Sequence, residues 1–196
     1  MHEVAKRPSA YVLTMAKERP KREEYYLNIA KQVAERATCF RNKGGAIIVK
    51  DDVIVATGYI GAPRKTKDCF ERGYCLRDKL KIPHGRYYEI CRSCHAEQNC
   101  IINSARAGVS LLGGDMYIYH RDREGKEMDS FPCFICKKMI INAGLKRVIC
   151  STKEKGMKIF NVEDWVKEWQ EKDILDDEYQ YGRDLNIKEK LKDDLS

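Results

Sequence analysis

Three side chains with the donor atoms that zinc prefers occur in two short segments. His95 offers an imidazole nitrogen, and Cys133 and Cys136 offer two sulfurs. Because the two cysteines are three residues apart, both would project from one face in the first turn of a helix, whose positive end stabilises thiolates. Three protein ligands leave one of the four tetrahedral positions of zinc to water. This is the arrangement of a catalytic site rather than of a closed structural one.

A carboxylate accompanies this ligand set. Glu97 comes two residues after His95, so it need not bind the metal and can lie above the water. Zinc lowers the pKa of bound water to about 7, and a positioned carboxylate can carry the proton to a ring nitrogen and then to a departing amine. With Pro132 before the cysteines, these residues match the H-x-E…P-C-x-x-C signature of zinc deaminases. The alternative is a structural zinc site, for which Glu97 would have no use.

The elements that must position these residues follow from apolar periodicity and from Gly and Asp turn signals. Helices are predicted over 23–36, 95–106, 133–143 and 162–169, and strands over 46–49, 53–57, 116–120 and 147–150. This order predicts an α/β fold in which a mixed sheet is layered between helices. Both ligand segments begin helices, where α/β folds place their ligand sites. Residues 60–93 lack periodicity and are predicted to form a long loop.

Composition limits the classes of protein to consider. The chain has 196 residues, 43% hydrophobic and 34% charged, which fits one soluble globular domain. It has no apolar run long enough for a membrane span and no clean signal peptide, so we expect a cytoplasmic protein. Nine cysteines, an odd number, then indicate reduced thiols and metal rather than disulfides. A net charge of +7 suits a phosphate-bearing ligand, whereas basic residues interspersed with acids argue against nucleic acid.

The chain resembles the deoxycytidylate (dCMP) deaminase family of the cytidine-deaminase-like superfamily, from about Tyr25 to Cys150. The matching segments are Ala37-Thr38-Cys39, Thr57-Gly58-Tyr59, Cys75-Leu76-Arg77, His95-Ala96-Glu97-Gln98-Asn99 and Pro132-Cys133-Phe134-Ile135-Cys136. The resemblance implies a three-layer α/β/α sandwich with a central mixed sheet. It implies zinc-dependent hydrolysis of dCMP to dUMP and ammonia, which supplies dUMP for thymidylate synthesis. It also implies a homo-oligomer, often a hexamer, with dCTP and dTTP as effectors.

Three further residues are candidates for substrate binding. The backbone N–H of Ala96, at a helix start, is a natural donor to the cytosine O2. Asn99 could hold the ligand or the backbone of the site. The resemblance implies that Arg106 engages nucleotide phosphate, across a subunit boundary, and the alternative is a surface arginine near a helix end. Ile60 stands where family members commonly have Asn, a departure that bears on sugar recognition and on the effectors.

Four cysteines outside this motif could form a second, closed zinc site that would hold the long loop. They are Cys39, Cys69, Cys75 and Cys91. The alternative is a set of buried reduced thiols, with His84 as a substitute ligand. His120, a lone histidine, is interpreted as a packing or surface residue.

The domain organisation predicted from these patterns has three parts. Residues 1–22 form an N-terminal extension, 23–170 the deaminase domain and 171–196 a charged C-terminal tail. Residues 121–129 are interpreted as a charged insertion, either a solvated loop or a lid. Two other functions stay open: a zinc deaminase that acts on another cytosine or adenine nucleotide or nucleoside or on tRNA, and a non-catalytic zinc module that binds a partner.

Overall fold

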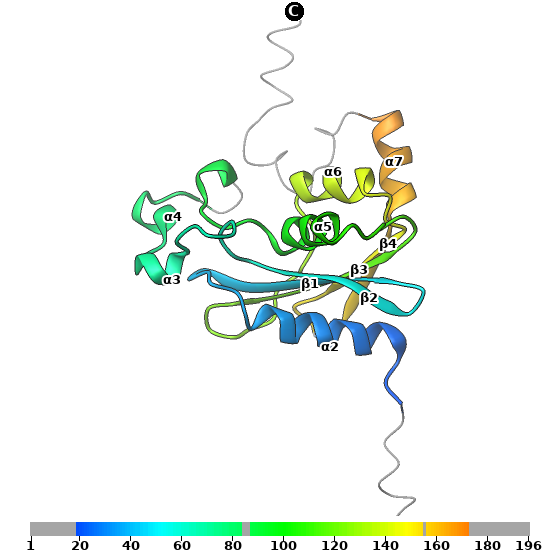
Figure 1. The fold of residues 1–196 in the computed structure, drawn as a ribbon, viewed down its shortest axis with the longest axis horizontal. Coiled ribbons are helices and arrows are strands. Elements are labelled where there is room, and N and C mark those ends of the chain that lie inside the picture. The colour runs from blue at the N-terminus through cyan, green and yellow to red at the C-terminus, as the bar shows by residue number, and fades with distance from the viewer. Residues whose placement is uncertain (1–18, 84–86, 155, 173–196) are drawn as a thin grey trace, which may run out of the picture.

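The computed structural model describes residues 19–83, 87–154 and 156–172, in which five strands form one mixed sheet (Figure 1). The strands lie in the order β2-β1-β3-β4-β5. Their bounds are β1 (Asn42–Lys50), β2 (Val53–Tyr59), β3 (Asp115–Asp122), β4 (Arg147–Ser151) and β5 (Met157–Asn161). β3 and β4 are parallel, and the other neighbouring pairs are antiparallel. The predicted hairpin and mixed sheet are therefore confirmed.

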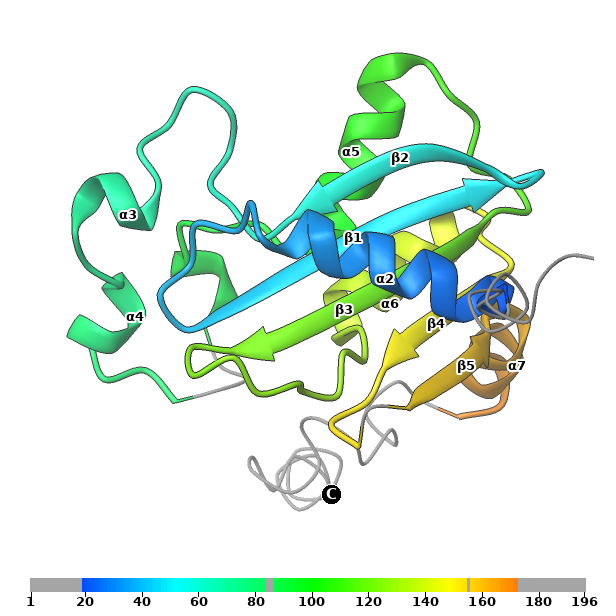
Figure 2. The ribbon, with the colours of Figure 1, turned by 90° about the horizontal axis from the view of Figure 1, so that it is seen from below.

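Helices cover both faces of this sheet. α2 (Arg22–Ala34) lies across one face, and α5 (Ala96–Ala107) and α6 (Phe134–Asn142) lie on the other (Figures 1 and 2). α7 (Val162–Glu171) follows β5 and contacts α6. The predicted three-layer α/β/α arrangement is confirmed. No helix in the described ranges is long and apolar enough to cross a membrane.

The alternation of side chains along the strands divides the core into two clusters. On β1, Ile47 and Val49 point to the α2 side, whereas Ala46 and Ile48 belong to the cluster that also includes residues of α5 and α6. All four are at most 1% exposed. A strand buried on both faces has a continuous apolar run rather than an alternating one, which explains the sequence Ala46 to Val49.

Two glycines bring the helices close to the sheet. A β-carbon on Gly45 would collide with the backbone of α2 at Ala30 and Ala34, and one on Gly58 would collide with the backbone of α5 at Cys100 and Ala96. Because backbone atoms cannot rotate away, both positions require the missing side chain. Gly58 thus sets the distance between β2 and α5, the helix that begins with the candidate catalytic residues.

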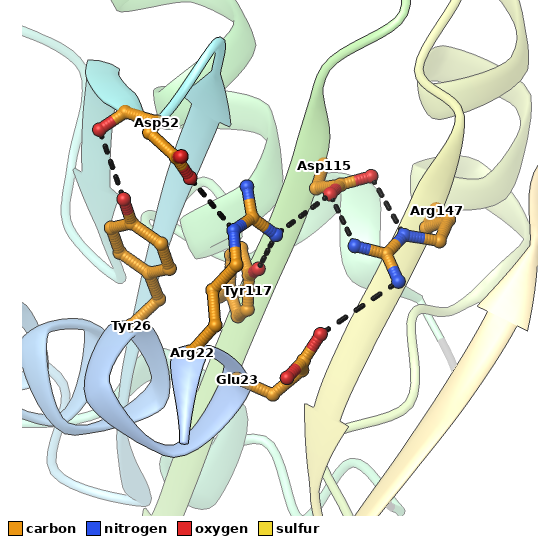
Figure 3. Close-up of polar contacts among 7 residues, drawn as sticks. All are labelled: Arg22, Glu23, Tyr26, Asp52, Asp115, Tyr117 and Arg147. Atoms are coloured by element: carbon orange, nitrogen blue, oxygen red, sulfur yellow. Dashed lines mark hydrogen bonds and ion pairs between the residues drawn. The ribbon is translucent and has the colours of Figure 1, made fainter. Parts of the chain in front are cut away.

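A network of charged side chains holds the start of α2 against the sheet (Figure 3). Asp115 of β3 accepts two hydrogen bonds from Arg147 of β4, at 3.0 and 2.6 Å, and lies 3.3 Å from Nη1 of Arg22. Arg22 also donates to Asp52, in the β1–β2 turn, at 2.8 Å, and to the hydroxyl of Tyr117 at 2.9 Å. The network therefore connects α2 to β3, to β4 and to the β1–β2 turn.

Some elements differ from those predicted. β5 was not expected, because Met157 and Ile159 are 40% and 44% exposed and the strand has no buried alternation that a sequence pattern could show. The long loop contains α3 (Cys69–Arg72), α4 (Leu76–Lys79) and the 3-10 helix η1 (Tyr88–Ile90), each too short to produce a period. The boundary predicted at residue 23 falls within one residue of the start of α2. Most of the predicted N-terminal extension and C-terminal tail lies outside the described residues.

The charged segment 121–129 packs toward α2. β3 extends through Asp122, and Arg121 and Glu127 form an isolated bridge. Arg121 donates to Glu35 at 2.9 and 3.0 Å, and Lys31 lies 3.2 Å from Glu127. These contacts attach the segment to the face of the sheet opposite α5 and α6.

Candidate active site

A cavity of about 770 Å³ lies where α5 and α6 begin. His95, Glu97 and Cys133 contribute to its wall, as do Ile60 of the loop after β2 and His120 of β3. Segments far apart in the sequence therefore meet at one cavity, and the motif residues His95, Glu97, Pro132 and Cys133 are part of its wall.

The three predicted ligands converge. Nδ1 of His95 lies 3.5 Å from the sulfur of Cys133 and 3.4 Å from that of Cys136, and the three ligand atoms are all within 4.8 Å of one another. Zinc bonds of about 2.3 Å to sulfur and 2.0–2.1 Å to nitrogen, at a tetrahedral angle, require a sulfur–nitrogen separation of about 3.6 Å. The donor set therefore fits zinc in both chemistry and spacing.

Helix starts hold these ligands in place. His95 and Cys133 are the N-cap residues of α5 and α6, with extended backbones, and Cys136 lies in the first turn of α6. The backbone N–H of His95 donates to the side-chain oxygen of Gln98 at 2.8 Å, which fixes the first turn of α5. Both helices therefore present their positive ends to the cluster.

The two thiols share one proton unequally, and the hydrogen bond with Cys133 and burial raise the pKa of Cys136 well above its ordinary value. Hydrogen bonds from Cys136 and His95 outweigh the effect of burial and lower the pKa of Cys133 to about 5. A thiolate is the form that binds metal. For His95, burial acts to lower the pKa, but the hydrogen bond with Cys133 and the charge of Glu97 together leave it raised.

Glu97 is the buried acid of the cavity. Its side chain is in the first turn of α5 and the residue is 1% exposed, yet within the described ranges its Oε2 atom has no hydrogen-bond partner. It is not one of the three residues that form the ligand group. An ionisable oxygen that is buried without a partner needs an explanation, and a reacting ligand in the cavity supplies one.

The three residues predicted to bind substrate do not line the described cavity wall. Ala96 is buried at the first position of α5. Asn99 donates from Nδ2 to the carbonyl oxygens of Tyr59, at 2.8 Å, and Gly61, at 3.4 Å, so it ties α5 to the end of β2. Arg106 is exposed in the last turn of α5. For Asn99, the backbone-holding alternative has direct geometric support.

The second zinc site stays a prediction. Among the residues that the structure describes, Cys39, Cys69, Cys75 and Cys91 do not form a group whose ligand atoms converge as those of the first site do. Burial is the largest effect on the pKa values of Cys39 and Cys69, and it raises both. Neighbouring groups, which include other thiols of this set, have smaller effects. His84 lies outside the described residues.

The polar residues of the cavity wall that sequence reasoning did not assign to the site include Arg77, Ser93 and His120. Each of these three has at least one buried side-chain nitrogen or oxygen without a hydrogen-bond partner in the described part of the chain. His120 is half-buried. Its Nε2 atom is buried and has no hydrogen-bond partner among the described residues, and burial lowers its pKa. No local pattern marks His120, because its pairing with Gly44 across β1 and β3 is a property of the fold.

Comparison with known proteins supports this interpretation. The family model described as "Cytidine and deoxycytidylate deaminase zinc-binding region" matches residues 20–152. A deoxycytidylate deaminase of Mycobacterium phage D29 is 34% identical over 137 residues, which cover 67% of this chain and 94% of that protein. One of Schizosaccharomyces pombe is 29% identical over 152 residues, 78% of this chain, but the match spans only 44% of that longer protein.

A solved structure is also similar. The crystal structure of dCMP deaminase from the cyanophage S-TIM5 in apo form is 28% identical, covers 66% of this chain and 82% of its own, and has a TM-score of 0.48. The family match extends over the ligand set, Glu97 and the helices α5 and α6 that carry them. The chain belongs to the cytidine and deoxycytidylate deaminases, of which it contains the zinc-binding region.

Proposed function

We propose that this protein hydrolyses dCMP to dUMP and ammonia, with a zinc ion held by His95, Cys133 and Cys136. The observation that carries the proposal is the position of Glu97. Its buried Oε2 atom, which has no partner in the described part of the chain, lies in the cavity that His95 and Cys133 line, and these two with Cys136 leave one zinc position open. The names of the similar proteins favour dCMP over other deaminase substrates.

Zinc, when bound, would supply a Lewis acid that makes water acidic near neutral pH. Glu97 then takes a proton from the attacking water and delivers it to N3 of the cytosine ring. The oxygen forms a bond to C4, and Glu97 moves the second proton to the amine as the C4–N4 bond breaks. One water enters and one ammonia leaves, so the ring becomes that of dUMP. Burial of Glu97 serves this role. Once the carboxylate has taken a proton from water, shielding from solvent directs that proton to the substrate rather than to bulk water.

Other side chains would orient the base. The Nε2 of His120, which has no hydrogen-bond partner in the ranges that the structure describes, lies on the same wall as Glu97 and offers a hydrogen bond to a polar ligand. Ile60, 7% exposed, offers an apolar contact. The N–H of Ala96 at the start of α5 is proposed as the donor to O2, and Asn99 as the residue that holds the adjoining loop.

The wider proposals follow from family membership. They are a deaminase domain over residues 23–170, a homo-oligomer of hexameric size, a cytoplasmic location and supply of dUMP for thymidylate synthesis. Regulation by dCTP and dTTP is proposed with them, although Ile60 stands where an Asn is common and changes the polarity at that position. Arg106, exposed on α5, is proposed to reach phosphate across a subunit boundary.

Ammonia release from a panel of substrates tests the function. Purified protein would be assayed with dCMP, cytidine, dCTP and adenosine at equal concentrations and matched zinc content. We expect dCMP to be the preferred substrate. Preference for another cytosine or adenine compound would reassign the substrate within the zinc deaminases, and no release from any compound would leave a zinc module that binds without catalysis.

A further inference from the structure

Arg77, in the four-residue helix α4, is a buried cation on the wall of the cavity. The residue is 3% exposed. Its Nε and Nη1 atoms have no hydrogen-bond partner among the described residues, and no carboxylate there forms an ion pair with it. Arginine stays protonated in proteins, so a full positive charge with donors on two nitrogens is buried without a counter-ion.

The side chain is nevertheless held in position. Its third nitrogen, Nη2, donates to the carbonyl oxygen of Pro83 at 2.7 Å. Its guanidinium carbon lies 4.9 Å from the centre of the Tyr88 ring. Burial of a charged group is unfavourable unless the charge is paired. A fixed, unpaired guanidinium beside a cavity is therefore a site prepared for an anion.

This anion site is close to the candidate metal centre. The Tyr88 ring, 4.9 Å from the guanidinium carbon, makes an edge contact with the His95 ring at 5.0 Å between centroids, so Arg77 lies within about 10 Å of His95. Arg77, Tyr88, His95 and Glu97 all line the same cavity. A molecule with its reacting ring at Glu97 and an anionic group at its other end would span this distance.

The lysines and the second arginine of the wall are less suited to this role. Lys137 is only half-buried, and its ammonium group lies over the rings of Phe134 and Trp165, at 5.4 and 5.2 Å. Arg41 is paired with Asp78 at 2.7 Å and donates to the carbonyl oxygen of Ile82 at 3.0 Å. Lys158 is exposed, and its ammonium group lies over the rings of Phe131 and Phe160, at 5.5 and 5.0 Å. Arg77 combines burial with unpaired donors.

We infer that Arg77 binds the 5′-phosphate of the nucleotide substrate and so determines the preference for a nucleotide over a nucleoside. The inference rests on the proposed function, whose substrate class it explains. A phosphate offers several acceptor oxygens to the donors on Nε and Nη1, and charge-assisted hydrogen bonds of this kind are the strong ones. Arg77 contacts substrate away from the reacting ring, so it acts in binding and specificity.

The test compares Arg77→Gln and Arg77→Lys with Arg72→Gln, an exposed arginine of the same loop, and with Arg106→Gln. The value of kcat/KM is measured for dCMP and for deoxycytidine. We expect Arg77→Gln to lower the value for dCMP by about 10–100-fold and to leave that for deoxycytidine within about twofold. Arg77→Lys keeps the charge but not the planar fork, so it should recover part of the loss. Arg72→Gln should match wild type.

Equal losses for dCMP and deoxycytidine in both Arg77 variants, with normal zinc content, would show that Arg77 only supports the fold and would overturn the inference. Loss of dCMP preference in Arg106→Gln but not in Arg77→Gln would also overturn it. If Arg77→Gln does not fold, the Lys variant alone decides by its dCMP-to-deoxycytidine ratio.

Calorimetric binding of dUMP and deoxyuridine separates this inference from the proposed function, because it needs no turnover. We expect wild type to bind dUMP more tightly than deoxyuridine. Loss of this difference in the Arg77 variants would support the anion site even if no ammonia is released. Turnover of dCMP with unchanged dUMP binding in the variants would support the deaminase and reject the role of Arg77.

Discussion

Gly44 and His120 face each other across β1 and β3, with no room for a β-carbon on the glycine. An ideal β-carbon at Gly44 would overlap Cδ2 and Nε2 of the His120 ring. The glycine thus makes space for an imidazole whose Nε2 is buried and lacks a partner in the described part of the chain. The relationship connects a residue of the sheet interior to the wall of the cavity.

Gly44→Ala should therefore impair activity more than folding. The new methyl group meets the side chains of His120 and Ile60, which can move, so we expect the imidazole to be displaced and kcat/KM for dCMP to fall by about tenfold or more. Overpacking of this kind destabilises by about 1–3 kcal/mol. Turnover is compared with the urea-unfolding free energy.

Gly45→Ala is the matched control, since its β-carbon would meet the backbone of α2 instead. It should lower stability by about 3 kcal/mol without a specific effect on the folded fraction's activity. Gly44→Ala with wild-type kinetics would contradict the role given to His120.

The Asp115 network predicts a stability effect remote from the active site. Asp115→Ala leaves the guanidinium groups of Arg147 and Arg22 without their shared carboxylate. The Asp115 side chain is 11% exposed, so we expect a loss of about 2–3 kcal/mol of unfolding free energy, less than for a fully buried pair. For a chain of this size, Tm should fall by roughly 5–10 °C, with the kcat of the folded enzyme unchanged.

Glu124→Ala is the control for that variant, because its ion pair with Arg123 is exposed and 3.9 Å long. It should change stability by less than about 0.5 kcal/mol. Equal effects of the two substitutions would show that the network contributes nothing beyond a surface charge.

The contacts of Glu35 predict how the free energy of unfolding depends on pH. Hydrogen bonds from Lys43 and Arg121 lower its pKa below the usual 4.5. A group whose pKa is lower in the folded state stabilises the fold above its unfolded pKa, and this contribution is lost as pH falls through the folded value. The unfolding free-energy difference between wild type and Glu35→Gln should be constant above about pH 5 and should shrink on further acidification. A difference that grows toward acid pH would contradict these contacts.

Metal content separates the two predicted zinc sites. Cys133→Ser should remove about one zinc per chain and abolish turnover, because one of three ligands is lost. Cys75→Ala should remove a second equivalent and destabilise the loop if the four-cysteine site exists, since metal binding free energy is then folding free energy. Full zinc content and unchanged Tm in Cys75→Ala would show that the second-site prediction is wrong.

The main elements of the active site could be predicted because local signals coincide there. The starts of α5 and α6 carry the ligand motif, and Gly108 and Gly144, both at positive φ, come at or just after their ends. Arg77 could not be recognised in the same way. Its burial depends on Pro83 and Tyr88, which reach it from a segment without periodicity. A charged side chain in such a loop is exposed in most proteins, and only tertiary packing reverses this.

His120 shows the same limit on a regular element. A single histidine near the end of a strand forms no periodic pattern. The residue that it faces depends on the register between β1 and β3. The register places Gly44 opposite it, and that pairing is a long-range property. Sequence patterns therefore predicted the three side chains that converge as a candidate metal site, together with the buried Glu97, while the residues that shape the remaining wall required the fold.

The most direct test of the proposed mechanism is the turnover of dCMP by wild type and Glu97→Gln at matched zinc occupancy. Gln keeps the size and hydrogen-bonding capacity of Glu97 but cannot carry a proton. Because Glu97 is not one of the three ligands, metal content and Tm should remain close to those of wild type. General acid–base catalysis contributes about 10²–10⁴-fold, and one group that serves both N3 and the amine should lie at the upper end. We predict a loss of kcat of about 10⁴-fold or more; a variant within a few-fold of wild type would contradict the mechanism.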